Sequence, residues 1–441
     1  MKTRTLVAKF AVAALLLGTT AACGSDSDKG VATEGGGDVT LTYWASNQGT
    51  SLDNDKEVLT PLLAAFTEET GIKVELEAIG WSDLQTRIQT AVTSGQGPDV
   101  VNIGNTWSVS LQATGAFLPF GDTEMEAIGG ADKFVEVALE TGGEAGSDPT
   151  SVPVYGLAYG LYYNKAMFAE SGVEPPTTWE EMVTAAQALT DPAQDQYGFG
   201  LAAGSYTENN HFAFINGAQN GASVFDDEGN PTFTEDGVVQ GILRYLDLMQ
   251  TDKVVNPSNA QYDNGSFAMT DFANGKVAMI LNQNNADATI ASNGMTSDEF
   301  GVVAFPAPSD AVSDVASHVA GINLSIFANT EHPDESLQFV KYMTSPEVQT
   351  TLGRPFSALP VLKDAEASFT DNAEEAATFI EIYNTRSMPL PLVPAEDQFE
   401  TTVGQAMNAM FATIATGGTV TEADIKAAMQ TAQDQVAASI G

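Results

Sequence analysis

The sequence predicts an α/β protein with a mainly parallel sheet flanked by helices, in a chain that crosses from one structural unit into another. Three observations predict it. Strand and helix patterns alternate over residues 39–103, the 441 residues can fill two or more domains, and a loose stretch at residues 141–150 precedes a buried aromatic run at residues 152–163. A loop followed by such a run is typical of a chain that passes between two units.

The alternating part begins with a strand at residues 39–44, where apolar and polar side chains alternate, and residues 72–79 show the same pattern. Apolar residues recur at helical spacing between and after these strands, and a third, apolar strand follows. The predicted helices are residues 58–70 and 83–93, and the third strand is residues 99–103. This β-α-β-α-β order implies parallel strands with helices on the faces of the sheet.

Two polar loops follow the first and third of these strands. One contains Asn47 and Gln48, and the other contains Asn105 and Trp107. Because ligands of open parallel sheets bind beyond the carboxyl ends of the strands, both loops are candidates for a binding site.

The aromatic run leads into two predicted helices. A short helix over residues 166–170 stops at Gly172, and Thr178 and Glu181 then have the T-x-x-E spacing of a capping box. The capping box predicts the start of the next helix at this threonine.

A run of four amides follows the predicted strand at residues 276–281 and occupies positions 282–285. Four amides at the end of a strand are costly to bury without partners, so we expect them to face water or a polar ligand. The other predicted strands are residues 197–201, 300–305 and 318–327, and the other predicted helices are residues 238–249, 267–272, 335–343, 373–383, 399–416 and 421–439.

Composition excludes several classes of partner and site. The formal net charge of −41 disfavours nucleic acid and anionic lipid headgroups, which bind through clusters of Lys and Arg. One cysteine allows neither an intramolecular disulfide nor a cysteine-based zinc site, and the three histidines lack metal-site spacing. We therefore expect no metal and no cofactor.

The N-terminus has the pattern of a targeting segment. Residues 1–22 combine a basic start with an apolar stretch too short to span a bilayer, which predicts a signal peptide. Thr20-Ala21-Ala22-Cys23 resembles a bacterial lipobox, although Thr20 stands where that pattern usually has Leu. The resemblance implies lipidation of Cys23, with residues 23–38 as a flexible tether; an ordinary secretory cleavage site is the alternative.

An ordered set of short motifs resembles the extracellular solute-binding proteins of ABC importers, in the oligosaccharide-binding branch that includes maltose-binding protein. The set extends over nearly the whole chain after the leader. Its members are Thr70-Gly71-Ile72-Lys73-Val74, Ser94-Gly95-Gln96-Gly97-Pro98-Asp99-Val100, Tyr163-Asn164-Lys165, Pro176-Thr177-Thr178-Trp179-Glu180-Glu181, Phe272 with Gly275 and Ala278-Met279, Ala320-Gly321-Ile322, and Ser345-Pro346-Glu347.

The resemblance implies a two-lobed, periplasmic-binding-protein-like fold with a ligand cleft between the lobes. The N-terminal lobe would comprise residues 39–150 and 305–350, and the C-terminal lobe residues 151–304 and 351–441. The chain would be a monomer at the extracellular face of the membrane, held there by its lipid. It would capture a sugar, with an oligosaccharide expected, by closure of the lobes and deliver it to the permease subunits without acting as an enzyme.

Sugars are bound by amide and hydroxyl groups that pair with their hydroxyls, and by aromatic faces that stack on their rings. Asn285 falls where maltose-type proteins have a stacking tryptophan, which implies a wetter subsite. The candidate ligand-binding residues are Asn47, Gln48, Asn105, Trp107, Tyr159, His211, Asn285, Arg354 and Phe399.

Other functions are weighed against this one. Tyr162 and Tyr163 resemble the paired tyrosine ligands of ferric-ion-binding relatives, but neighbouring residues of a strand point to opposite faces. The acidity would suit a polyamine, and a secreted glycoside hydrolase would need two carboxylates flanking the sugar. Trp44 and Tyr163 are expected in the core, while Trp81 and Tyr155 could belong to the core or the site.

Overall fold

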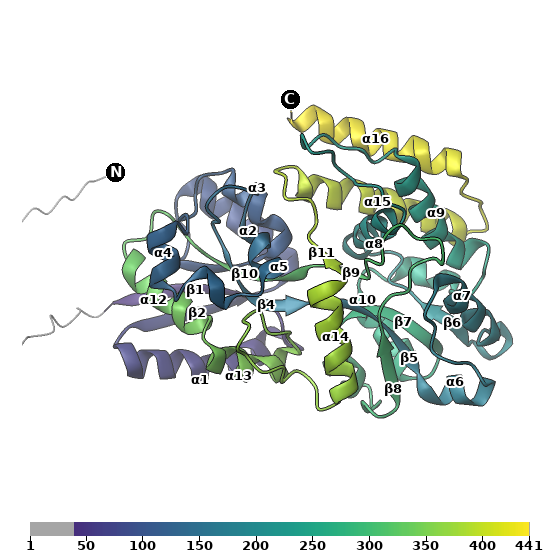
Figure 1. Cartoon of the computed structure of the whole chain (residues 1–441), viewed down its shortest axis with the longest axis horizontal. Coiled ribbons are helices and arrows are strands. Elements are labelled where there is room, and N and C mark those ends of the chain that lie inside the picture. The colour runs from purple at the N-terminus through teal and green to yellow at the C-terminus, as the bar shows by residue number, and fades with distance from the viewer. Residues whose placement is uncertain (1–38, 441) are drawn as a thin grey trace, which may run out of the picture. The chain divides into compact units, whose positions relative to one another are not determined.

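The computed structural model describes residues 39–440, which form an α/β fold around two large sheets, with a third sheet of only two short strands (Figure 1). The first sheet has the order β2-β1-β3-β10-β4. Its strands are β1 (Thr40–Ser46), β2 (Lys73–Ile79), β3 (Val100–Gly104), β4 (Val152–Leu157) and β10 (Ala320–Ile326). β1 is parallel to β2 and β3, as the sequence predicts, and β10 lies antiparallel between β3 and β4.

Helices cover this sheet and begin and end for local reasons. α1 (Leu52–Thr70) is capped by Ser51, whose hydroxyl accepts from the backbone N–H of Asn54, and ends at Gly71 with φ 79°. It starts two turns before the predicted position because its first turns are too polar to show apolar periodicity. The other elements on this sheet are α2 (Trp81–Ser94), η1 (Asn105–Trp107), α3 (Ser108–Gln112), α4 (Asp122–Ala127), η2 (Ala131–Lys133), α5 (Glu136–Leu139), η3 (Glu140–Gly142), α12 (Pro333–Met343) and α13 (Pro346–Phe356).

The second sheet has the order β6-β7-β5-β8. Its strands are β5 (Tyr159–Asn164), β6 (Tyr197–Gly200), β7 (Val277–Gln283) and β8 (Phe300–Val303). β6 and β7 are parallel, whereas β5 is antiparallel to β7 and β8. Both sheets are therefore mixed rather than mainly parallel. β5 enters the second sheet directly from β4 of the first sheet, with one residue between the two strands.

Helices surround the second sheet, and the C-terminal part of the chain supplies several of them (Figure 1). α7 (Trp179–Ala188) begins at Thr178, whose hydroxyl accepts from the Glu181 N–H, while the Glu181 carboxylate accepts from Thr177. The other elements here are α6 (Lys165–Ser171), η4 (Pro192–Gln194), α9 (Asp236–Gln250), η5 (Pro257–Gln261), α10 (Gly265–Ala273), α11 (Ala286–Ser292), β9 (Ser317–His318), α14 (Ala373–Thr385), β11 (Ser387–Met388), α15 (Glu396–Ala415) and α16 (Glu422–Ile440).

The longest helix of this part without a counterpart in the sequence prediction is α8 (Tyr206–Gln219). It packs between α15 and α9, and all of its residues from Asn209 onward are buried. A helix that is buried on every side has no polar stripe, so its sequence shows no amphipathic period.

The chain passes between the two large sheets at three places, and hydrogen bonds link the residues at these places. Ala158 is the one residue between β4 and β5. Its backbone N–H donates to the side-chain oxygen of the buried Asn284 at 2.8 Å, and the backbone N–H of Asn284 donates to the Ala158 carbonyl at 3.1 Å. The amide of Asn284 also donates to the carbonyl of Ser357. The backbone N–H of Tyr159 donates to the hydroxyl of Ser317 at 2.9 Å.

These passages lie a few residues away from the predicted lobe boundaries. β4 belongs to the first sheet although residue 151 is the predicted start of the second lobe. Leu352 and Phe356 of α13 also pack into the core of the first sheet. The difference arises because the aromatic run is two strands in two sheets, not one strand.

The predicted signal peptide at residues 1–22, Cys23 and the tether to residue 38 lie outside the described residues. Within residues 39–440, no helix combines the length and the apolar character that a membrane crossing requires.

Candidate ligand-binding cleft

A cleft of about 710 Å³ is lined by residues of both sheets and their helices. The side of the first sheet contributes the loop after β1 and the start of η1. The side of the second sheet contributes the end of β7 and the N-terminal turns of α8 and α15. Seven of the nine predicted ligand-binding residues line it: Asn47, Gln48, Asn105, Trp107, Tyr159, His211 and Asn285.

The loop after β1 is held by the buried carboxylate of Asp55. This carboxylate accepts from the side-chain amide of Asn47 at 2.6 Å and from the backbone N–H groups of Gln48 and Gly49 at 3.0 and 2.6 Å. Three hydrogen bonds to one carboxylate fix the loop before any ligand arrives. Asn47 therefore supports the loop at the same time as it lines the cleft.

Two tryptophans form the aromatic surface on this side. The rings of Trp81 and Trp107 meet edge to face at 5.5 Å, and the indole N–H of Trp81 donates to the carbonyl of Asn47 at 2.7 Å. Both rings line the cleft, and Trp81 also packs against the core of the first sheet. Asn105 is almost fully buried and donates to the carbonyl of Val319 at 2.7 Å, which ties η1 to the segment before β10.

Three aromatic residues meet on the opposite wall. The Tyr159 hydroxyl lies 3.0 Å from Nδ1 of His211, and the His211 ring lies 4.0 Å from that of His318. Burial lowers the pKa of both histidines, to about 3 for His318, so both imidazoles are neutral near pH 7. Nδ1 of His318 has no hydrogen-bond partner among the described residues.

Glu208 and Asn282 converge where Gly265 leaves space. A Cβ at Gly265 would lie 2.9 Å from a Glu208 carboxylate oxygen and 2.6 Å from the Asn282 amide nitrogen. Asn282 is 6 % exposed, yet its amide nitrogen has no partner among the described residues. Burial raises the pKa of Glu208 to about 8, against the effect of a hydrogen bond from the Gly265 N–H. An acceptor and an unpaired donor thus lie together at the cleft.

An exposed tyrosine stands at the mouth of the same wall. Tyr206, the first residue of α8, is 43 % exposed and lines the cleft. Its backbone packs tightly against α15 at Gly404. A side chain at this glycine would clash, because its Cβ would lie 2.1 Å from the Tyr206 carbonyl oxygen. The close approach of the two helices therefore requires a glycine there.

The first turns of α15 bring carboxyl groups to the cleft. Asp397 and Glu400 line it, and the buried Glu396 lies behind them. Burial raises the pKa of Glu400 to about 7, while a hydrogen bond from the Thr106 hydroxyl of η1 opposes this. Burial and the neighbouring Glu400 carboxyl also raise the pKa of Glu396. Neither carboxyl oxygen of Glu396 has a partner in the ordinary hydrogen-bond geometry among the described residues.

Two predicted site residues lie away from the cleft. Phe399 is fully buried and packs its ring 5.4 Å from that of Phe233, because the helix face with Asp397 and Glu400 turns it to the opposite side. Arg354 lies in the last turn of α13 on the surface, where it pairs with Asp371 at 3.0 Å and remains half exposed. Neither side chain lines the cleft.

The tyrosine pair proposed for iron also lies away from the cleft. The Tyr162 hydroxyl donates to the carbonyl of Gln283 at 3.1 Å, and the Tyr163 ring packs 5.1 Å from Phe168. Within residues 39–440, no three side chains of His, Cys, Asp or Glu gather so as to hold a metal ion.

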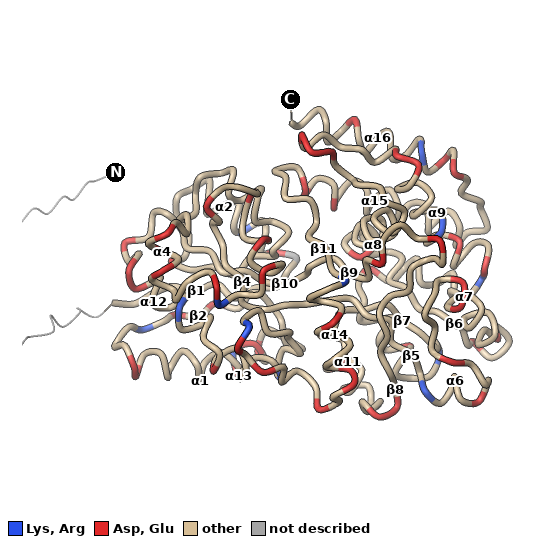
Figure 2. The backbone as a smooth tube through the Cα atoms, in the orientation of Figure 1, with Lys and Arg blue, Asp and Glu red and all other residues tan. Residues whose placement is uncertain are grey.

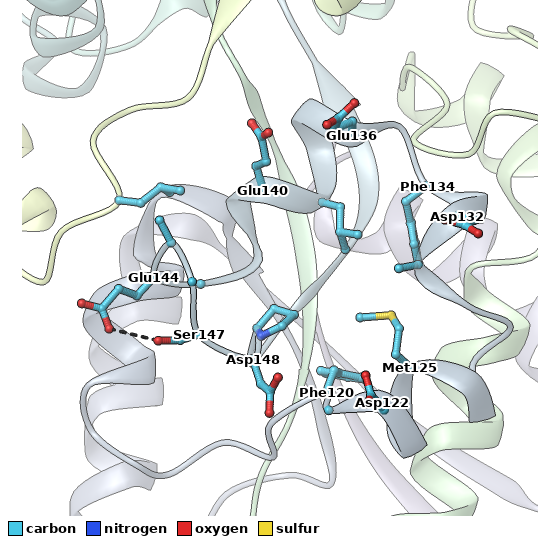
Figure 3. A pocket seen from close by; sticks show the side chains of 18 of the residues that line it. Phe120, Asp122, Met125, Asp132, Phe134, Glu136, Glu140, Glu144, Ser147 and Asp148 are labelled. Atoms are coloured by element: carbon cyan, nitrogen blue, oxygen red, sulfur yellow. Dashed lines mark hydrogen bonds between the residues drawn. The ribbon is translucent and has the colours of Figure 1, made fainter.

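A second hollow of about 870 Å³ lies beside the first sheet (Figure 3). We call it the acidic hollow; residues 120–149 line most of it, with Lys363 and Leu392 from elsewhere. Glu136, Glu140 and Glu144 are exposed on it, and Figure 3 shows the bond from Ser147 to Glu144. It is larger than the cleft, but it does not gather side chains from both sheets.

Comparison with known proteins agrees with this architecture. The chain is 25% identical over 331 residues to the putative ABC transporter periplasmic-binding protein YcjN of Escherichia coli (strain K12), covering 73% of this chain and 74% of the relative. It is 25% identical over 389 residues to the diacetylchitobiose binding protein DasA of Streptomyces coelicolor, covering 85% and 86%.

A similar fold occurs in a solved structure, the ABC transporter solute binding protein of Thermotoga lettingae TMO bound with alpha-D-tagatose. The TM-score is 0.77 at 21% identity, over 91% of this chain and 100% of that one. The family model for bacterial extracellular solute-binding proteins matches residues 49–350, more than half of the sequence. The chain therefore belongs to the family of bacterial extracellular solute-binding proteins.

Proposed function

We propose that this protein is the substrate-binding component of an ABC importer and that it captures an extracellular sugar, with an oligosaccharide as the expected ligand. The observation that carries the proposal is the cleft wall at Gly265, where the Glu208 carboxyl and the unpaired Asn282 amide lie together. A sugar hydroxyl donates one hydrogen bond and accepts others, so one hydroxyl can satisfy both groups.

Aromatic surfaces on both sides of the cleft support a sugar. Trp81 and Trp107 present rings from the first side, and the exposed ring of Tyr206 stands on the other. Rings of this kind stack on the C–H faces of pyranoses. The similarity to a relative named for diacetylchitobiose and to a structure bound with alpha-D-tagatose points the same way.

Capture works by closure of two lobes over the ligand. Residues 39–157 with 320–356 form the N-terminal lobe, and residues 159–303 with 373–440 form the C-terminal lobe. Ala358 and Leu362, which lie between these ranges, still pack in the core of the first sheet. A ligand that contacts both cleft walls stabilises the closed state more than the open one and so shifts the population toward it. The permease subunits bind the closed form. The protein works as a monomer, and a lipid on Cys23 holds it at the extracellular face of the cell membrane.

Two alternatives receive less support. Ferric iron would need Tyr162 and Tyr163 in the cleft, yet the first is bonded to Gln283 and the second packs on Phe168. A glycoside hydrolase remains the enzymatic alternative, since Glu208 and Glu400 both line the cleft. We assign them to binding because the family to which the chain belongs consists of solute-binding proteins.

A thermal-shift screen over mono- and oligosaccharides tests the proposal. A ligand at about a hundred times its Kd adds about 2.7 kcal/mol of stability, which raises the melting temperature measurably. The shift should disappear in Asn282→Ala and persist in Arg354→Gln, whose side chain lies on the surface. If no sugar raises the melting temperature of the wild type, the proposal is wrong, and release of shortened sugars during incubation would show an enzyme instead.

A further inference from the structure

One buried carboxylate behind the cleft supports one of its walls. Acidic residues are spread along the backbone (Figure 2), but Asp55, in the first turn of α1, is 0 % exposed and does not line the cleft. Its three hydrogen bonds come from the side-chain amide of Asn47 and the backbone N–H groups of Gln48 and Gly49. These three residues do line the cleft. Asp55 therefore reaches the site through the loop after β1.

The start of α1 does not require this carboxylate. Ser51 caps the helix by accepting from the Asn54 N–H, and the backbone N–H of Asp55 donates to the Ser51 carbonyl at 3.0 Å. An exposed acid such as Asp53 interacts with the helix dipole without being buried. Burying a carboxylate costs free energy unless hydrogen bonds offset it, and here the loop supplies those bonds.

The same loop orients Trp81. The indole N–H of Trp81 donates to the Asn47 carbonyl at 2.7 Å, and the backbone N–H of Asn47 donates to the Ile79 carbonyl at 3.1 Å. The rings of Trp81 and Trp107 meet edge to face over Gly104, where a Cβ would lie 3.7 and 3.4 Å from them. A displacement of the loop therefore moves the acceptor that orients the Trp81 ring.

We propose that Asp55 is a positioning residue for sugar binding, because its carboxylate holds the loop after β1 so that the Trp81 ring is in place for stacking before the sugar arrives. The inference rests on the proposed function and assigns part of the affinity to a side chain that does not line the cleft. An aromatic surface that is already ordered reduces the entropy that binding has to overcome.

Hydrogen exchange at the indole N–H of Trp81 tests this without any sugar. The four tryptophans give four indole signals in a nitrogen–proton NMR spectrum, and Trp81→Phe identifies the signal of Trp81. Asp55→Asn sets an amide donor against the donors of the loop, so the Trp81 N–H should exchange about tenfold faster in this variant.

Two further variants address the same contact from the other side. Asn47→Asp, at a partly exposed loop position, sets two carboxylates against each other and should also speed the exchange; it decides the question if Asp55→Asn does not fold. The double variant Asn47→Asp with Asp55→Asn restores a donor opposite an acceptor at the same net charge. Its Trp81 N–H should exchange more slowly than in either single variant.

The control is Asp99→Asn in the first sheet. The Asp99 carboxylate also accepts three hydrogen bonds, from the backbone N–H and hydroxyl of Thr42 and from the hydroxyl of Thr330, but Asp99 does not line the cleft. This variant should leave the exchange of the Trp81 N–H unchanged, with the folded state of each variant verified by melting. Equal exchange in wild type and Asp55→Asn, or the same acceleration in Asp99→Asn, overturns the inference.

Calorimetry measures the consequence for binding. The probes are the trimers of α-1,4-linked glucose, β-1,4-linked glucose and β-1,4-linked N-acetylglucosamine. Asp55→Asn should raise the Kd of a trimer that binds the wild type about fivefold, in the range of one aromatic contact. In the Trp81→Phe background, which keeps a ring but has no N–H donor, the same change should raise the Kd less than about twofold. Full additivity of the two changes overturns the positioning role. If no trimer binds the wild type, that result counts against the sugar proposal, and the exchange rates still decide this inference.

Discussion

Glu208 is expected to make the folded protein less stable as the pH rises, and Glu208→Gln should remove the effect. Burial raises its pKa from an ordinary value of 4.5 to about 8. The folded state therefore keeps a proton that the unfolded state releases, so stability falls as the pH rises from about 4.5 to about 8. Each pH unit in this window costs about 1.4 kcal/mol, which makes the cost at pH 7 about 3 kcal/mol.

The glutamine variant has no proton to lose and can still accept from the Gly265 N–H. It should match the wild type near pH 4.5 and be more stable by about 3 kcal/mol at pH 7. Urea unfolding without ligand, followed by tryptophan fluorescence at both pH values, measures the difference. Glu140→Gln, an exposed site on the acidic hollow, is the control for net charge. The reasoning would be refuted if the difference in unfolding free energy between variant and wild type were the same at both pH values, or if the variant were the less stable protein at pH 7.

Three further predictions follow from side-chain placement. Phe399→Ala should lower the unfolding free energy by about 3–5 kcal/mol in denaturant unfolding, because the side chain is fully buried. The folded fraction should keep its sugar affinity. A loss of affinity with unchanged stability would show that Phe399 contacts the sugar. Trp107→Leu should weaken sugar binding about fivefold by calorimetry because a stacking face is lost, and an unchanged Kd would contradict this. Arg354→Gln should change the unfolding free energy by less than about 1 kcal/mol and leave the Kd unchanged, since its ion pair is exposed; a larger change in either would be unexpected.

The sequence could predict the elements whose patterns are local. The first three strands and the helices between them have regular periods, and the loops with Asn47 and Asn105 follow from the rule that ligands bind beyond strand ends. The family resemblance added Tyr159, His211 and Asn285, and all three line the cleft.

The remaining parts of the site depend on packing that the sequence does not display. Glu208 lies in the first turn of α8, whose residues from Asn209 onward are buried on every side and so show no period in the sequence. Ser205 and Glu208 do have capping-box spacing. Glu396 and Asp397 fall in the polar first turn of α15, which the predicted helix, starting at Phe399, omitted. The close contact between Gly404 and the backbone of Tyr206 sets which face of α15 meets the cleft. These two residues lie nearly 200 positions apart in the sequence.

The place of β10 in the first sheet bears on how the chain folds. β10 comes from residues 320–326 yet lies between β3 and β4, and it is the only strand in that sheet that pairs with β4. Until those residues are available, β4 is a buried strand with no ladder partner and an open edge. Loop closure over such a separation is slow, and unpaired edges promote aggregation. A fragment that ends before residue 320 should therefore be insoluble, even though it contains most of the first lobe.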